Sequence, residues 1–423
     1  MKKALYILIL LILPSMMFAQ QLSVNLEQCR DSAKVNWPGF KKMAMQKENK
    51  ELIIKTLNKN YLPKLTLGAG ATYQSEVVVF PEIQIPGMDN FFPTIPNDNY
   101  RADLQLSQII YDGGNTKSAK DLQLASNSLE ETQIEIENYN LMEQINQLYL
   151  NVLVLEQNNI VLLTADKEID ENLKILQSAY NNGMILASEL NKVKAEKITI
   201  EKQLMNNKTA KLNAIQSLAV LTGLEINYDT SFQVPGESTN KLNTLPQLKI
   251  FEAQEDLNKA GLEMEFRNKF PKIALFANGG YGRPGYNFMD TDLHSYGMVG
   301  VNLSWDVIDW GTYGKQKEKS EVKQKIIEAN KEAFVMQNSL EVQKINNDLA
   351  NIQNQIEMDK KVIKIKEEIK NSSWSKFQNG TITSNEYLKD FNDLKRAQQT
   401  LEINKIQLIQ KELALKHLEG IKY

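Results

Sequence analysis

One pattern of residues occurs twice in this 423-residue chain. Residues 60–67 read NYLPKLTL, and residues 268–275, which begin 208 positions later, read NKFPKIAL. Pro38 lies 25 residues before the proline of the first string, and Pro246 lies 25 residues before the proline of the second. A spacing kept over this distance indicates that a whole structural unit was duplicated. The chain is therefore expected to fold as two copies of one supersecondary unit.

The repeat continues toward the end of the chain with a different offset. Residues 112–114 (DGG) match residues 309–311 (DWG), and residues 180–183 (YNNG) match residues 377–380 (FQNG), each 197 positions later. The change from 208 to 197 places about eleven additional residues in the first copy, and insertions of this kind lie in loops. We expect them in a long surface loop over residues 74–99.

The first nineteen residues have the composition of a secretory signal peptide. Two lysines precede an apolar run over residues 4–13, and the small residue Ala19 follows it, so the mature chain is expected to begin near Gln20. The run is too short for a membrane anchor, which needs roughly 20 apolar residues. No second long apolar stretch follows, so no membrane-spanning helix is expected. A single cysteine, Cys29, excludes a disulfide within the chain.

Charge and composition argue against several classes of function. The net charge is −3 and there is no long basic block, so nucleic acid is not an expected partner. The two histidines, His294 and His417, are far apart in the sequence and are expected to be surface residues. The chain contains no nucleotide-binding loop and no cluster with metal-ligand spacing. We therefore predict no catalytic, cofactor-binding or metal site, and no enzyme.

Alternating residues predict two β-hairpins, one within residues 61–112 and one within residues 271–309. After Pro63, the odd positions are apolar and the even positions are polar or small. The segment from Val299 to Val307 alternates in the same way, whereas Phe276 breaks the alternation of its strand because it falls on the polar side. The chain should therefore contain four amphipathic strands.

Outside these hairpins the apolar residues follow a helical heptad pattern typical of a coiled coil. We expect long helices over residues 114–180 and 314–376, each about 65 residues and roughly 100 Å long. After a glycine-containing turn, each should be followed by a returning helix, and each hairpin should be preceded by a shorter helix. The expected bounds are 188–221 and 384–419 for the returning helices, and 27–60 and 245–268 for the shorter ones.

The domain organisation follows from these elements. The signal peptide covers residues 1–19, the first structural repeat covers residues 20–222, and the second covers residues 245–423. The inter-repeat linker, residues 223–244, contains Pro235-Gly236.

Four amphipathic strands cannot close into a barrel, because a barrel needs about eight. A sheet of four would leave two unpaired edges, so several chains should contribute, and three would give twelve strands. The polar faces suit a water-filled lumen and the apolar faces suit lipid. Aromatic residues near the strand ends are candidates for the interfacial belts of such a barrel: Tyr61, Tyr73, Tyr281, Tyr296, Trp305 and Trp310. A sandwich in a soluble adhesin is the alternative.

The duplicated motifs resemble those of the TolC-like outer-membrane efflux proteins. The similar residues are the strand entries at 63–65 and 271–273, the helix entries at 112–114 and 309–311, and the hairpin turns described above. The resemblance implies a mainly α fold with a small β part: a long coiled-coil α-helical barrel and a 12-stranded transmembrane β-barrel formed by three chains, with an equatorial segment between the repeats.

The same resemblance implies a function and partners. Such proteins are homotrimers in the outer membrane of Gram-negative bacteria, where they contact lipid and extend a long tunnel into the periplasm. They are passive channels of tripartite efflux or type I secretion systems. They bind a periplasmic adaptor (membrane fusion) protein and an inner-membrane pump of the RND or ABC type, and they export small molecules or polypeptides. The alternative is a periplasmic coiled-coil structural or adhesin-like protein without a pore.

A candidate periplasmic gate lies near the helical turns. In the resembled family an acidic residue at this place helps to form a ring that favours cations, and Glu189 and Glu386 match it, six residues after the turn glycines Gly183 and Gly380. Three chains would give six carboxylates, whose mutual repulsion should raise their pKa. The alternative is that both glutamates are ordinary helix N-terminal acids.

Two aromatic residues complete the candidate gate. Tyr180 has a hydroxyl that can hydrogen-bond across it, whereas Phe377, at the equivalent position of the second copy, has none.

Overall fold

The computed structural model describes residues 23–81, 92–236 and 245–421. The predicted signal peptide therefore lies outside the described residues, as do parts of the 74–99 loop and of the linker. The chain divides into two compact units, and each takes segments from both sequence copies. Unit 1 consists of Met1–Lys42, Ile134–Leu248 and Glu332–Tyr423, and unit 2 consists of Met43–Gln133 and Lys249–Lys331. The two repeats are thus interleaved in space and do not form two separate domains.

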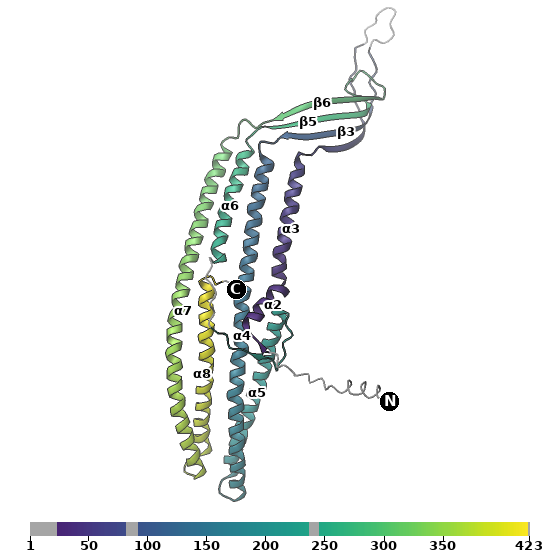
Figure 1. Ribbon diagram of the computed structural model, residues 1–423. Helices are drawn as coiled ribbons and strands as arrows, with labels where there is room; N and C mark the ends of the chain where they lie inside the picture. The colour runs from purple at the N-terminus through teal and green to yellow at the C-terminus, as the bar shows by residue number, and fades with distance from the viewer. Residues whose placement is uncertain (1–22, 82–91, 237–244, 422–423) are drawn as a thin grey trace, which may run out of the picture. The chain divides into compact units, whose positions relative to one another are not determined.

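Unit 2 contains one antiparallel sheet of four strands (Figure 1). The strands are β2 (Lys64–Tyr73), β3 (Asp98–Tyr111), β5 (Lys272–Arg283) and β6 (His294–Ser304). Their order is β2-β3-β5-β6, so the hairpin of each copy is intact and the two hairpins join through β3 and β5. Within the described residues, β2 and β6 are the edges of this sheet, and each pairs on one side only.

The register assembles one continuous apolar face from all four strands. Leu65 lies opposite Leu106, which lies opposite Ala277 on β5, and Ala277 lies opposite Val299 on β6. Leu67 and Leu104 extend this face by one step, and both leucines are exposed in the single chain. The opposite face carries polar and small residues such as Thr66 and Gln105. The alternation predicted from the sequence therefore describes two faces of one sheet.

The register places Phe276 on the polar face, where its ring covers a glycine on the next strand. A Cβ added to Gly300 would lie 2.6 Å from the Phe276 ring, and one added to Gly280 would lie 2.6 Å from the Tyr296 ring. Aromatic rings that cover glycines in neighbouring strands replace the missing side-chain contacts of a sheet. The residue that breaks the sequence pattern therefore contributes to strand pairing.

Strand β6 is shorter than its alternation predicts. It ends at Ser304, although the pattern continued to Val307. Beyond this point the Trp305 indole N–H donates to the carbonyl oxygen of Lys269 at 3.0 Å. The chain therefore leaves the strand pairing three residues earlier than expected.

The helix expected over residues 27–60 is broken in the structure. It forms α2 (Leu26–Asn36) and α3 (Pro38–Asn58), followed by the short 3-10 helix η1 (Lys59–Tyr61). Trp37 has an extended backbone with φ −69° and ψ 126°. A residue before proline is driven out of the helical region by contact with the proline ring, so the prediction of one continuous helix was wrong at Pro38.

Unit 1 is built mainly from the long helices. The elements are α4 (Asn115–Asn181), α5 (Ala187–Thr222), α7 (Thr312–Gln378) and α8 (Ser384–Leu418), with bounds within two residues of those expected. Helix α6 (Pro246–Arg267) precedes β5. Both α4 and α7 begin in unit 2 and end in unit 1.

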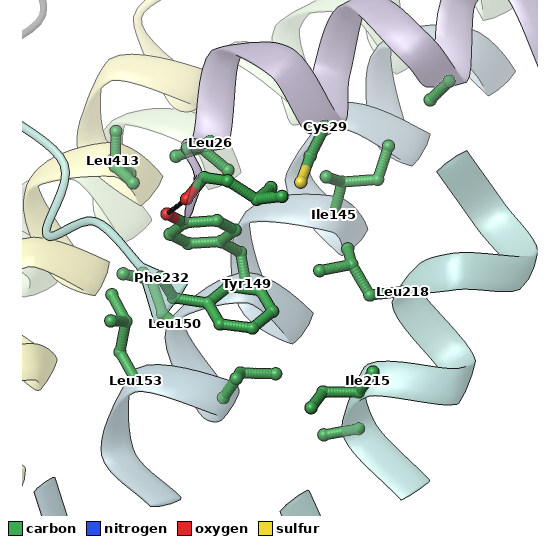
Figure 2. Packing of buried hydrophobic residues seen from close by; sticks show 14 of the residues in the cluster. Leu26, Cys29, Ile145, Tyr149, Leu150, Leu153, Ile215, Leu218, Phe232 and Leu413 are labelled. Atoms are coloured by element: carbon green, nitrogen blue, oxygen red, sulfur yellow. Dashed lines mark hydrogen bonds between the residues drawn. The ribbon is translucent and has the colours of Figure 1, made fainter. Parts of the chain in front are cut away.

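The core of unit 1 surrounds Tyr149 of α4 (Figure 2). Its ring contacts Phe232 edge to face at 5.4 Å, and its hydroxyl lies 2.8 Å from the Val24 carbonyl oxygen and 2.7 Å from that of Gln233. Val24 is the last residue of β1 (Ser23–Val24), and Gln233 directly follows β4 (Ser231–Phe232), which pairs with β1 in parallel. Burial raises the pKa of Tyr149, so the hydroxyl stays protonated and can donate.

One helix among the described residues has the length and composition of a membrane span. A stretch of helix α4 (Asn115–Asn181) is apolar enough to cross a membrane, and 39% of this stretch is buried inside the protein. No such helix was predicted from the sequence, so α4 differs from that expectation. The apolar part of α4 that includes Ile145, Tyr149 and Leu153 lies in the helical core of unit 1, and core helices of soluble proteins pass the same test.

Candidate gate at the helical hairpin turns

The two hairpin turns have the same backbone structure. Gly183 and Gly380 have φ of 72° and 70°, in the left-handed region that glycine adopts without strain. In the first turn the Gly183 N–H donates to the backbone carbonyl oxygen of Tyr180, and the Met184 N–H donates to that of Ala179. In the second turn the Gly380 N–H donates to the carbonyl oxygen of Phe377, and the Thr381 N–H donates to that of Lys376. Both are Schellman motifs, which end α4 and α7 at equivalent residues.

The returning helices begin differently, although their turns are alike. Helix α8 has a capping box in which Thr383 and Glu386 each accept from the backbone N–H of the other. The equivalent N-cap residue of α5 is Leu186, which makes no side-chain cap hydrogen bond. This replacement leaves Glu189 without a threonine partner in its own helix. The sequence signal for this capping box is the T-x-x-E pattern that begins at Thr383, which was not among the predicted features.

Glu189 instead caps the other hairpin. Its Oε2 accepts from the backbone N–H of Ser384, the first residue of α8, at 2.7 Å, and its Oε1 lies 3.1 Å from Lys192 Nζ. The hydrogen bonds from Ser384 lower the pKa of Glu189, and Lys192 adds to the effect. The higher pKa predicted for Glu189 depends on repulsion from carboxylates of other copies. Within one chain the shift has the opposite sign.

Phe377 is buried, whereas Tyr180 is exposed. Phe377 is 3% exposed and stacks on Tyr387 at 5.8 Å between ring centres, and Trp374 and Phe391 contact the same ring. The Asn172 side-chain amide donates to the Tyr387 hydroxyl at 2.6 Å. Phe377 is therefore part of the core that joins α4, α5, α7 and α8, and its position does not suit a free gate residue. Tyr180 is 41% exposed.

Two lysines of α5, at heptad positions that face α4, form ion pairs with acidic residues of α4. Lys197 Nζ lies 2.7 Å from Asp166 and 2.9 Å from Asp170, and Lys211 Nζ lies 2.9 Å from Glu156. Burial lowers the pKa of Lys197, but the hydrogen bonds to the two aspartates outweigh it and raise the pKa overall. These pairs explain how lysine can occupy heptad positions that otherwise hold leucine.

Two further ion pairs join one hairpin to the other. Lys370 of α7 lies 2.6 Å from Glu168 of α4, and Lys395 of α8 lies 3.3 Å from Glu196 of α5. The Lys395 side chain is only 5% exposed. Together with the Glu189 hydrogen bond, these contacts hold the ends of the two hairpins against each other. Sequence spacing alone does not reveal pairs about 200 residues apart.

A surface pocket lies beside the first turn. It has a volume of about 520 Å³ and is lined by Leu176, Met184 and Phe377 among other residues, so it lies between the end of α4 and the end of α7. Among the described residues, no group of three or more His, Cys, Asp or Glu side chains could hold a metal ion.

One of the two histidines is not the surface residue that the sequence predicted. The His417 ring stacks on Tyr139 with 4.2 Å between the ring centres, and burial lowers its pKa to about 4. The ring is therefore neutral at physiological pH. His294 is partly exposed, and its Nδ1 lies 2.9 Å from the Asp292 carbonyl oxygen.

The candidate belt residues have different environments. Tyr73, Tyr281 and Trp305 are exposed, and Trp310 is 90% exposed with a positive φ of 51°. Tyr296 packs edge to face against Tyr286. Tyr61 differs from these because its hydroxyl donates to Asp112 Oδ1 at 2.8 Å, which ties η1, before β2, to the turn between β3 and α4.

Both copies of the duplicated sequence match one known protein family. The family model for outer membrane efflux proteins matches residues 30–224 and 240–420, and the chain belongs to this family. It is therefore an outer-membrane transport protein, and the two matched segments follow the two sequence copies. The resemblance drawn from the motifs is confirmed. No curated protein sequence matches the chain.

Solved structures of outer-membrane channels share the fold over almost the whole chain. VceC from Vibrio cholerae is 16% identical with a TM-score of 0.69, and the match covers 94% of this chain and 96% of VceC. CusC is 13% identical with a TM-score of 0.73, covering 94% and 92%. MtrE from Neisseria gonorrhoeae, in its open state, is 14% identical with a TM-score of 0.69, covering 93% and 89%.

Proposed function

We propose that three copies of this chain close a twelve-stranded barrel in the outer membrane and form a passive efflux or secretion channel. The observation that carries the proposal is the sheet of four strands, whose two long edges are unpaired in the part of the chain that the structure describes. Pairing β2 of one copy with β6 of the next would satisfy both edges, and a closed ring removes every edge.

The two faces of the sheet fit the two environments of such a barrel. The apolar face, which includes Leu67 and Val299, is exposed in the single chain and would face lipid. The polar face would line a water-filled lumen. The exposed residues Tyr73, Tyr281, Trp305 and Trp310 would lie at the membrane interfaces. The segment between β2 and β3 would lie outside the cell; the last two residues of the 74–99 segment expected from the sequence belong to β3.

The helical hairpins would continue the channel into the periplasm. An inner-membrane pump of the RND or ABC type would supply the energy, and a periplasmic adaptor would dock near the hairpin turns, where the pocket beside Met184 offers an apolar surface. The chain itself would carry out no chemical step. Small molecules and polypeptides are both compatible with a lumen of this kind.

The hairpin turns would form the gate. Glu189 and Glu386 would contribute a ring of six carboxylates in the trimer, and the hydrogen bonds to Glu189 would keep that carboxylate ionised. Cation selectivity and block by divalent cations would then depend on these two residues. If Glu189→Gln combined with Glu386→Gln leaves both properties unchanged, the acidic ring is wrong.

The channel itself is tested by assembly and conductance. Outer-membrane fractions should contain a trimer that dissociates on heating in detergent, and the purified trimer should give discrete single-channel currents in planar bilayers. A soluble periplasmic monomer would overturn the proposal and would favour the structural or adhesin-like alternative. A trimer without ion conductance would also contradict it.

A further inference from the structure

Two lysines occupy equivalent positions at the entry of the two strand hairpins. Lys64 is the first residue of β2, and Lys272 is the first residue of β5, 208 positions later. Lys64 lies opposite Ser107 and Lys272 lies opposite Ser304, so both belong to the polar face of the sheet. Both lysines are exposed.

Closure of a barrel would bring these lysines to one height. Lys64 is in register with Ser107, and Ser107 is in register with Phe276, four residues beyond Lys272 on β5. Strands of a closed barrel are tilted, so residues at equal height are staggered from strand to strand. If the two copies occupy equivalent places in the barrel, Lys64 and Lys272 lie at the same height, and the four-residue offset between them is the stagger over two tilted strands. Three copies would then place six lysines in one ring.

Acidic residues on the same face offset only part of the charge of this ring. Among the described residues, neither Lys64 nor Lys272 has an ion-pair partner. The polar face of the strands also carries Arg101 and Asp103, which have opposite charges. Of the acids near the strand ends, Asp309 pairs with Lys269 at 3.5 Å and Asp112 accepts from Tyr61. Asp306, two residues past β6, makes no ion pair with either lysine, and its single carboxylate per chain offsets at most one of the two ammonium charges.

We infer that Lys64 and Lys272 form a cationic ring in the lumen, at the end of the barrel nearest the helices, and that the ring favours anionic solutes. The inference rests on the proposed trimeric channel. Twelve strands about 4.8 Å apart and tilted by about 40° give a barrel about 24 Å across. At about 0.1 M salt the Debye length is about 10 Å, so the field of six ammonium groups reaches the axis, whereas at 1 M it is about 3 Å and does not.

The test compares reversal potentials of the purified trimer in planar bilayers under a KCl gradient. In Lys64→Gln combined with Lys272→Gln, the permeability ratio of K⁺ to Cl⁻ should rise about threefold near 0.1 M and should change little near 1 M. The matched control, Lys64→Arg combined with Lys272→Arg, keeps the charge and should retain the wild-type ratio. Each single glutamine variant should give about half of the logarithmic change.

The possible outcomes separate the ring from the channel. A conducting wild-type trimer whose ion selectivity is the same in the glutamine variants overturns the ring and leaves the channel intact. An arginine variant that behaves like the glutamine variant also overturns it, because the charge would then not be the cause. A wild-type protein that forms no conducting trimer overturns the proposed function and the ring together. If the double variant fails to form trimers, the single variants decide.

Discussion

The hydrogen bond from Ser384 to Glu189 joins the two helical hairpins, and removing it should loosen the first turn of α8. Glu189→Ala deletes the acceptor and leaves the Ser384 N–H, now 2.7 Å from Oε2, without a partner. An unsatisfied buried donor costs about 1–3 kcal/mol, and the loss of a helix cap costs about 1 kcal/mol. A value near 1.4 kcal/mol for this partly buried group corresponds to about a tenfold change in the local opening equilibrium.

Amide hydrogen exchange followed by mass spectrometry measures that equilibrium. In Glu189→Ala, exchange of the peptide around residues 383–388 should become about tenfold faster, although the substituted residue lies in α5. Lys192→Gln is the control, because it removes only a half-exposed ion pair worth about 0.5 kcal/mol. If exchange increases only around residues 187–191, the bond between the hairpins does not hold them together and the reasoning is refuted.

The same bond should depend on pH with a known sign. The pKa of Glu189 is lowered from 4.5, so its contribution to stability is fully present above pH 4.5 and is lost as the pH falls through the folded-state pKa. Exchange at residues 383–388, corrected for its intrinsic pH dependence, should therefore accelerate below about pH 4.5. Glu189→Gln cannot ionise and should not show this acceleration.

Three further substitutions test other parts of the structure. Gly183→Ala forces a residue with a Cβ into a φ of 72° and should destabilise the first turn by about 1 kcal/mol, measured by hydrogen exchange around residues 179–185; an unchanged rate would contradict the Schellman assignment. Tyr149→Phe removes the hydroxyl between the Val24 and Gln233 carbonyl groups and should lower the free energy of unfolding by about 1–2 kcal/mol; denaturant titration measures this change, and an equal midpoint would show that the hydroxyl makes no net contribution. His417 has a pKa lowered from 6.5 to about 4, so the unfolded chain binds a proton that the folded chain does not, and stability should fall as the pH decreases from 6.5 to 4. His417→Phe should reduce that fall by up to about 3 kcal/mol in unfolding measured against pH, and an identical pH profile would refute the burial argument.

The architecture was predictable because it depends on periodic patterns that occur twice. Heptads specify long helices, alternation specifies strands, and duplicated motifs fix their order. The break at Trp37 was also readable, since a proline follows it, and the capping box at Thr383 has a known signature. These two features were missed, although their signals are local.

Other features depend on contacts that no local pattern contains. The acceptor for the Ser384 N–H is Glu189, which lies 195 residues away in another helix. Glu189 is not engaged in a capping box of its own helix because Leu186 stands where α8 has Thr383. Phe276 appeared to break its strand pattern because the glycine that its ring covers is on the neighbouring strand. The position of Phe377 in the repeat predicts a gate residue. Its burial cannot be predicted from that position, because it depends on contact with Tyr387 in the returning helix.

The unpaired edges of β2 and β6 have a consequence for biogenesis. If the sheet is complete only when three copies meet, the folding of the strands and the association of the chains are one process. Its rate then depends steeply on how much protein has reached the membrane, and its apparent stability has no meaning without a stated protomer concentration. A chain that has not yet associated with two others exposes strand edges that can pair with any extended segment. A single copy is therefore open to wrong pairing until two others are present.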